Sequence, residues 1–374
     1  MQFRYPLLLL IVVLFNACTQ DETPAPTFEV PATYDGANYR SDVATANALR
    51  IQLNSLVNEA KRGRVVTNTV LAATLEQLYT TSNPSLRDAT TVYYHGLLTG
   101  TSGFFAELAK ASGNAYSPGT PTGNGGVYGG YLFDENGLEL EQLIEKGLFG
   151  SLNYFQADQL LRGPISQPVL NQVLALYGAH PDFANTPTAA NATNPDVFMA
   201  NYAARRSDVN DANSLYNQMK KAFITAQAAI KAGESRLAER NAALADIRLL
   251  WEKINAATVI NYCHSVISTM SQTAPTDAQK AAALHAYGEC VGFLHGWRQL
   301  PADGKRISDV QLDELLTLLL AAPGTAPESY KFITEPGAQL PKLQDVIGRL
   351  QTIYGFTNAE VESFRNNWVS LQNR

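Results

Sequence analysis

Apolar residues recur at intervals of three and four along most of the chain, and this spacing places them on one face of an α-helix. In the segment 41–62, for example, Leu49, Leu53 and Leu56 share one face. No stretch shows the strict apolar–polar alternation that predicts a half-buried β-strand. The sequence therefore predicts an all-α fold, a multi-helix bundle long enough for two packed helical-bundle subdomains. The predicted helices cover residues 41–62, 70–79, 103–110, 136–161, 166–177, 195–233 with a break near 207–211, 234–270, 276–300 and 341–354, and two more start at 308 and 357.

Polar residues mark where several of these helices begin. The pairs Thr276 with Gln279, Ser308 with Gln311, and Thr357 with Glu360 have the spacing of a capping box. Residues 115–131, in contrast, are rich in glycine and proline and predict a long loop. A loop of this length in a compact domain often carries function.

Two segments, 256–270 and 281–297, are apolar on nearly all sides, which predicts two fully buried helices. Only about five residues separate the first helix from the cap of the second, so the two should pack antiparallel. On the second helix Gly288, Gly292 and Gly296 recur at every fourth position. They form a smooth ridge that another helix can approach closely.

This hairpin also carries the strongest chemical pattern in the chain. His285 and Glu289 lie one turn apart on the same helix face, and folding the hairpin near Thr276 places His264 level with Glu289. Buried groups of this kind are costly unless they are paired or ligated. Three interpretations stay open: a hydrogen-bonded or ionic network, a metal or ligand site of the kind that helical bundles build from carboxylates and histidines, and catalysis. A metal ion is the one cofactor that the pattern suggests.

Cys263 and Cys290 also fall level with each other in the folded hairpin. In an oxidising compartment they are candidates for a disulfide. The alternative is a pair of buried thiols, since the Cys-x-x-Cys spacing of a redox pair is absent.

The first residues of the chain have a different character. Arg4 precedes an apolar run of nine residues, 7–15, whereas a membrane-spanning helix needs about 20. Ala17 then stands directly before Cys18, and this pattern resembles the lipobox of a bacterial lipoprotein signal. We therefore expect residues 1–17 to be a signal peptide, Cys18 to carry the lipid anchor, residues 18–33 to form a flexible tether, and residues 34–374 to form the helical domain.

Charged residues add to the prediction of where the protein is located. Asp21 and Glu22 follow the anchor closely and resemble the acidic export signal of surface lipoproteins, so we expect an outer-membrane lipoprotein exposed at the cell surface. The net charge is −6 and no basic run is present, which argues against a nucleic-acid partner. The motifs His-Glu-x-x-His and Gly-x-Ser-x-Gly are absent, so the commonest metallopeptidase and esterase signatures are missing. No catalytic residue is predicted.

Several segments of the chain occur in a recognisable order. They are Tyr34-Asp35-Gly36, Asp134-Glu135-Asn136-Gly137-Leu138, Ile144-Glu145-Lys146-Gly147-Leu148, Trp251-Glu252-Lys253, His285-Ala286-Tyr287-Gly288-Glu289 and Lys305-Arg306-Ile307-Ser308-Asp309. Together these segments resemble a family of envelope proteins from Bacteroidetes and proteobacteria, the domain of unknown function 4856. The resemblance covers most of residues 34–372. It implies a helical body similar to imelysin-like proteins, which pair two helical bundles and are associated with iron acquisition.

The chain departs from these relatives at two points. Imelysins carry a Gly-x-His-x-x-Glu motif, whereas His285 and Glu289 have a different spacing, so that role is not carried over. Family members also show a cluster of acidic residues and histidine before an aromatic–glycine pair. Here the corresponding stretch, Asn171 to Gly178, contains no acidic residue.

Three functions follow from the anchor, the fold and the resemblance. The first is a binding or accessory lipoprotein in iron or other metal uptake, working beside an outer-membrane receptor. The second is a metal-dependent hydrolase that uses His285, Glu289 and His264. The third is a glycan-binding outer-membrane lipoprotein, which would expose tryptophan platforms, although the tryptophans fall in predicted buried or amphipathic helices. We expect a binding protein rather than an enzyme.

Overall fold

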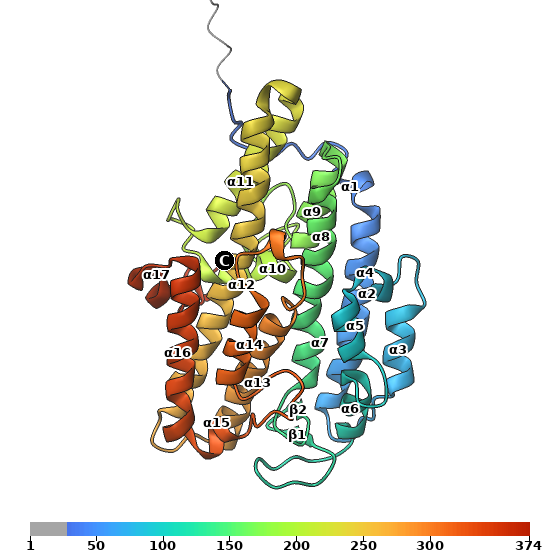
Figure 1. Cartoon of the computed structure of the whole chain (residues 1–374), viewed down its shortest axis with the longest axis vertical. Helices are drawn as coiled ribbons and strands as arrows, with labels where there is room; N and C mark the ends of the chain where they lie inside the picture. The colour runs from blue at the N-terminus through green and yellow to red at the C-terminus, as the bar shows by residue number, and fades with distance from the viewer. Residues whose placement is uncertain (1–27) are drawn as a thin grey trace, which may run out of the picture.

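The computed structural model describes residues 28–374. The predicted signal peptide, Cys18, Asp21, Glu22 and most of the tether lie outside the described residues. Within them the chain is an elongated bundle of helices with one short two-stranded sheet (Figure 1), so the prediction of an all-α multi-helix bundle is confirmed. None of the described helices is long and apolar enough to cross a membrane.

The middle of the bundle contains the two helices that the sequence predicts to be buried. α12 (Leu237–Met270) runs along most of the molecule, and α13 (Asp277–His295) packs beside it after a short turn (Figure 1). α7 (Leu140–Leu148) packs against α13 and continues through the π-helix η2 (Phe149–Tyr154) into α8 (Phe155–Arg162). These elements position the candidate site.

The other helices flank this middle layer, and all share one core. Buried apolar side chains form a single cluster that extends along the chain from Tyr34 to Val369. Before α12 in the chain these flanking elements are α1 (Tyr39–Asp42), α2 (Ala44–Lys61), η1 (Arg62–Arg64), α3 (Ala72–Thr80), α4 (Leu86–Ala89), α5 (Val92–Leu98), α6 (Phe104–Ala111), α9 (Gln167–Tyr177), α10 (Phe198–Arg206), α11 (Leu215–Ala232) and η3 (Gly233–Arg236). The C-terminal part consists of η4 (Ala302–Gly304), α14 (Asp309–Leu318), α15 (Lys331–Thr334), α16 (Pro336–Tyr354), α17 (Asn358–Ser363) and α18 (Trp368–Leu371).

Local sequence signals set most helix starts. All three predicted capping boxes are present, at the N-termini of α13, α14 and α17. Several expected starts are wrong by a few residues, among them that of α16, which begins at Pro336 instead of residue 341. α7 begins at Leu140 instead of residue 136, because the Asp134 carboxylate accepts the backbone N–H groups of Asn136 and Leu138 and holds a turn there. α10 begins at Phe198 instead of residue 195, and α13 ends at His295, before residue 300.

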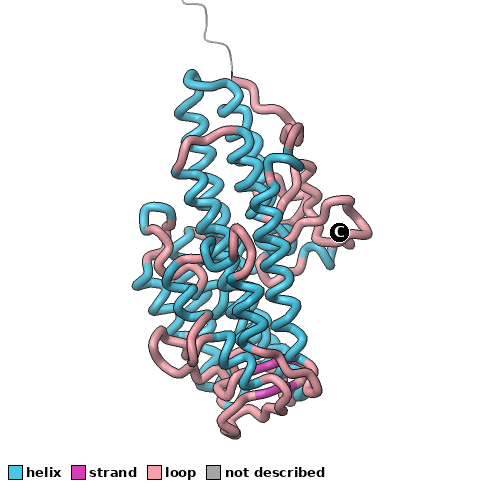
Figure 2. The backbone as a smooth tube through the Cα atoms, turned by 90° about the vertical axis from the view of Figure 1, so that its right-hand side faces the viewer, coloured by secondary structure: helices cyan, strands magenta, loops and turns pink. Residues whose placement is uncertain are grey.

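The glycine-rich segment 115–131 does not remain a loop throughout. Its end forms the strand β1 (Gly126–Tyr128), which pairs antiparallel with β2 (Tyr131–Phe133) at one end of the molecule (Figure 2). The expectation of no strands is therefore wrong at this hairpin. Gly129 and Gly130 both have positive φ angles, 55° and 87°, as the favoured two-residue hairpin turn requires. Strands of three residues are too short to show an alternating pattern.

Candidate functional site

The candidate site lies where α7 crosses α13. A Cβ atom added at Gly292 would lie 2.6 Å from the carbonyl oxygen of Gln142, and one at Gly296 would meet the backbone of Gly147. The glycine ridge of α13 therefore allows the two helix backbones to come into direct contact, as the sequence predicts. Charged side chains from both helices share the buried space beside this contact.

These charged side chains form one connected group, which we name the ion cluster. They come from α7, α13, the residue that caps α7, and the end of α2 with the adjoining η1. Its members are Lys61, Arg64, Glu139, Glu141, Glu145, Lys146, His285 and Glu289. The sequence identified two of them, His285 and Glu289, and the structure brings these two together.

Glu139 joins the two halves of the cluster. One of its carboxylate oxygens lies 2.8 Å from the Arg64 guanidinium, and the other lies 2.6 Å from Nδ1 of His285. The aromatic ring of Tyr131, on β2, stacks on the His285 ring with 4.4 Å between centroids and also faces Arg64. The hairpin at the end of the glycine-rich segment therefore covers one side of the cluster.

Lys146 is the cation at the other end. Its Nζ lies 2.9 Å from Glu145 and 3.5 Å from Oε1 of Glu289, and the aromatic rings of Phe149 and Tyr202 lie beside it. Oε1 of Glu289 is also 3.7 Å from Nε2 of His285. The second oxygen, Oε2, is buried and has no hydrogen-bond partner among the described residues. Of the two carboxylates beside Lys146, Glu289 is therefore the one with fewer polar partners.

Burial sets the protonation of the carboxylates. It raises the pKa of Glu139, Glu141 and Glu289 to about 7 in each case, against the opposing effect of Arg64 or Lys146. Burial also raises the pKa of Glu145, but the two lysines outweigh this effect and hold its pKa at about 2. The cluster thus contains carboxylates that gain and lose protons near neutral pH.

The imidazole of His285 is neutral at pH 7. Burial lowers its pKa to about 3, and the cations of Arg64 and Lys146 act in the same direction. Nδ1 of the neutral ring and the carboxyl group of Glu139 share one hydrogen bond at 2.6 Å. A neutral imidazole beside carboxylates that titrate near pH 7 is suited to proton transfer. Here, however, each of these groups contacts another member of the ion cluster.

The metal interpretation can be tested against the donors that are present. Nε2 of His285 and Oε1 of Glu289 form one pair of donor atoms, while Glu139 and Glu141 face Arg64. Among residues 28–374, no group of three or more histidine, cysteine, aspartate or glutamate side chains is placed to hold a metal ion. The residues as they stand do not fit a resident metal ion.

The structure does not bring His264 to the other two predicted residues. Successive residues of a helix point about 100° apart, so Cys263 faces α13 while the neighbouring His264 lies toward the segment after α17. His264 lines a separate cavity of about 420 Å³ with Arg205, Arg206 and Arg365. The position of His264 along the hairpin follows from the sequence. The direction of its side chain depends on how α12 is rotated about its own axis.

The two cysteines meet as the sequence predicts. Their Sγ atoms lie 3.8 Å apart as free thiols, and both side chains are fully buried. Burial raises the pKa of the Cys290 thiol, and contact with Cys263 adds to this effect. The thiolate, which is the reactive form, is therefore disfavoured.

We expect the two thiols to react only after unfolding. In a Cys18→Ser chain, a thiol-specific colorimetric reagent should label neither cysteine in the native protein and both in guanidinium chloride. A Cys263→Ser control should then give one thiol instead of two. If unfolded protein purified from the cell envelope shows no thiol until a reductant is added, the pair is a disulfide there.

The sequence missed most of the ion cluster, although one signal was present. Lys146 falls three residues after Leu143 and three before Phe149, on the apolar face of α7. A charge at such a position indicates a buried partner. The partners themselves, Arg64 and Glu139, come from other parts of the chain.

A buried glutamate outside the ion cluster has a structural role. Glu252 belongs to the Trp-Glu-Lys segment and is 1% exposed. Its carboxylate accepts the backbone N–H groups of Arg306 and Ile307, at 2.8 and 2.7 Å, and the hydroxyl of Tyr354 at 2.7 Å. It therefore fastens the segment before α14 and the end of α16 to α12.

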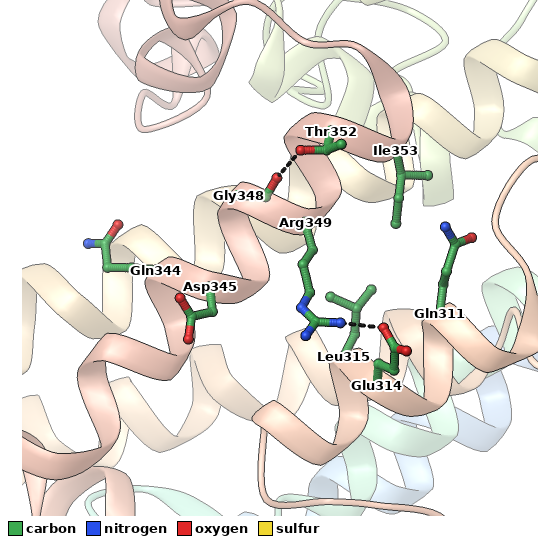
Figure 3. Close-up of a pocket in the computed structure, with 9 residues that line it drawn as sticks. All are labelled: Gln311, Glu314, Leu315, Gln344, Asp345, Gly348, Arg349, Thr352 and Ile353. Atoms are coloured by element: carbon green, nitrogen blue, oxygen red, sulfur yellow. Dashed lines mark hydrogen bonds and ion pairs between the residues drawn. The ribbon is translucent and has the colours of Figure 1, made fainter.

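A surface groove of about 620 Å³ lies between α14 and α16. Figure 3 shows Arg349 reaching across it to form an ion pair with Glu314, while the hydroxyl of Thr352 donates to the carbonyl of Gly348 at 2.9 Å. The central charges of this groove thus pair with each other. Apart from the helix-capping Gln311, the groove contains none of the residues named in the sequence analysis, and it contains no predicted site residue.

Comparisons of the chain with protein-family models, with curated proteins and with solved structures returned no match. The resemblance to the domain of unknown function 4856 and to imelysin-like proteins therefore stays a prediction from the sequence. The candidate site is described by its own geometry: a buried ion cluster at a glycine-lined helix crossing, and a separate arginine-lined cavity beside His264.

Proposed function

We propose that the mature chain is a lipid-anchored protein of the cell envelope that acts as a binding or accessory component in metal uptake, with iron as the expected metal. The resemblance of the segment before Cys18 to a lipobox, with Ala17 directly before the cysteine, supports the anchor. The resemblance to imelysin-like proteins supports the link to iron, with an outer-membrane receptor as the expected partner.

The mutual engagement of the ion cluster is the observation that favours binding over hydrolysis. A hydrolase needs a base, or a metal with an open position, that faces its substrate. Here Nδ1 of His285 is bound to Glu139, its ring is covered by Tyr131, and Glu289 is 5% exposed. His285 and Glu289, which have the spacing of metal ligands, therefore contact other members of the ion cluster and hold helices together.

A second observation favours this function over glycan binding. Trp251 and Trp297 are each 1% exposed and lie in the core. Flat sugar-binding platforms require exposed aromatic rings, so neither of these two tryptophans can serve as one in this arrangement. The third, Trp368, is half-buried, and its indole N–H donates to the hydroxyl of Ser363.

Cells that lack the chain should contain less iron when iron is limiting, as measured by mass spectrometry of washed cells. The intact chain should restore the iron content, and a Cys18→Ser chain, which cannot be anchored, should not. An unchanged iron content in the deletion strain would refute the role in iron uptake.

Metal analysis of the purified chain separates this proposal from the hydrolase alternative. We expect a substoichiometric metal content that Glu289→Gln leaves unaltered. Stoichiometric metal that is lost in Glu289→Gln, together with peptide hydrolysis by the wild type only, would establish the hydrolase instead.

A further inference from the structure

The cavity beside His264 is lined by cations and hydroxyl groups. It lies between the end of α10, one face of α12 and the segment that joins α17 to α18, and has a volume of about 420 Å³. We name it the arginine pocket. The residues that matter for its chemistry are Arg205, Arg206, His264, Ser265, Ser268 and Arg365.

The pocket has three guanidinium groups and no carboxylate among the residues that line it. Arg206 is 6% exposed, and its Nη1 donates to the carbonyl oxygen of Phe364 at 3.3 Å, while its Nε has no hydrogen-bond partner among the described residues. Within residues 28–374 the structure gives neither Arg205 nor Arg206 an ion pair. Arg365 pairs with Glu362, but both side chains of that pair are exposed to solvent. A buried cation without a counter-ion is costly, and a bound anion would remove that cost.

His264 lies in the wall of the pocket and is 4% exposed. Burial lowers its pKa to about 4 and the cation of Arg365 acts in the same direction, while a hydrogen bond to the Val361 backbone opposes them. The ring is therefore neutral at pH 7 and adds no charge to the pocket.

We propose that the arginine pocket binds a small molecule through a phosphoryl group. Arginine forks make paired hydrogen bonds to phosphate oxygens, and hydroxyl groups of Ser265 and Ser268 offer further donors. A phosphoryl group presents at least three acceptor oxygens, whereas a carboxylate presents two, so it matches this number of donors better. The volume exceeds that of phosphate alone and lies in the range of small-molecule sites, which leaves room for an organic part.

This proposal goes beyond metal uptake and does not depend on it, because the pocket contains no member of the ion cluster. Iron measurements in cells and phosphate binding in vitro can succeed or fail separately.

Inorganic phosphate is the probe for the test. Titration calorimetry of the purified chain at constant ionic strength should give saturable binding of one phosphate per chain. Glycerol phosphate should compete with it, and citrate should compete poorly. Arg205→Gln, which alters a partly exposed side chain, should weaken binding by about tenfold, which corresponds to about 1.4 kcal/mol.

Arg87→Gln is the matched control, because Arg87 is an exposed arginine of α4 that does not line the pocket. Its affinity for phosphate should equal that of the wild type. Ser265→Ala, at an exposed position of α12, should weaken binding without loss of fold as judged by thermal melting. No binding of phosphate, equal weakening by Arg205→Gln and Arg87→Gln, or tighter binding of citrate than of phosphate would each overturn the proposal.

Discussion

Leucine in place of Gly292 should lower the free energy of unfolding by about 3 kcal/mol, at the upper end of what overpacking costs. Even the first carbon of the new side chain would lie 2.6 Å from the carbonyl oxygen of Gln142 and 3.0 Å from Cβ of Lys146. The nearest atom belongs to the backbone of α7, which cannot rotate away. α7 would have to move from α13, and the ion cluster beside the contact would open.

Gly348→Ala is the matched control. Gly348 also lies within a helix, α16, but a Cβ atom there would meet nothing within 4 Å. Alanine should stabilise the protein by about 0.5–1 kcal/mol through its higher helix propensity. Urea denaturation followed by circular dichroism measures both changes. If Gly292→Leu is as stable as the wild type, then α7 and α13 do not touch through glycine.

Methionine in place of Lys146 should destabilise the protein by about 3–5 kcal/mol, because it leaves buried carboxylates without their cation. Lys146 lies 2.9 Å from Glu145 and 3.5 Å from Glu289, and its own side chain is 5% exposed. Glu145 keeps Lys61 as a second cation at 3.2 Å, whereas Glu289 keeps no cation, since the neighbouring His285 is neutral. Most of the loss should therefore come from Glu289.

The loss should depend on pH with a definite sign. Burial already raises the pKa of Glu289 from 4.5 to about 7, and without Lys146 its pKa would rise further. The folded variant then binds more protons than the unfolded chain, so its stability falls as pH rises through the window from 4.5 to above 7. The destabilisation should be larger at about pH 8 than at about pH 5.5.

Glu289→Gln in the Lys146→Met background should recover part of the lost stability and flatten the pH dependence. Lys221→Met, at an exposed position of α11, is the control and should change stability by less than about 0.5 kcal/mol. Urea midpoints at the two pH values provide the measurement. A Lys146→Met protein with the stability of the wild type at both pH values would show that the cluster does not hold α7 to α13.

Several features could be predicted because their cause lies within a few residues of sequence. The pair Thr276 and Gln279 forms its capping box from side chains three positions apart, so the pattern alone is sufficient. Cys263 and Cys290 could be matched because a short turn fixes the register of the hairpin. The glycine ridge could be predicted because every fourth residue of a helix returns to nearly the same face.

Other features depend on which elements meet. The hairpin of β1 and β2 contains three residues in each strand, too few for a period, and only the turn Gly129-Gly130 indicates it. The pattern placed His264 at the right height in the hairpin, but the packing of α12 rotates it toward the arginine pocket.

The sequence by itself determined the helical class, the helix caps, the buried hairpin and its glycine ridge, since each follows from the local periodicity of apolar, polar and glycine residues. Only the tertiary structure decided that His285 faces Glu139 and Tyr131, that Lys146 joins Glu145 to Glu289, and that three arginines converge beside His264. These residues come from distant parts of the chain. Arg205 and Arg365, for example, are 160 positions apart in the sequence and line the same cavity. The physical reason is that a buried charge takes its partner from whichever element packs against it, and the choice of that element depends on the whole core.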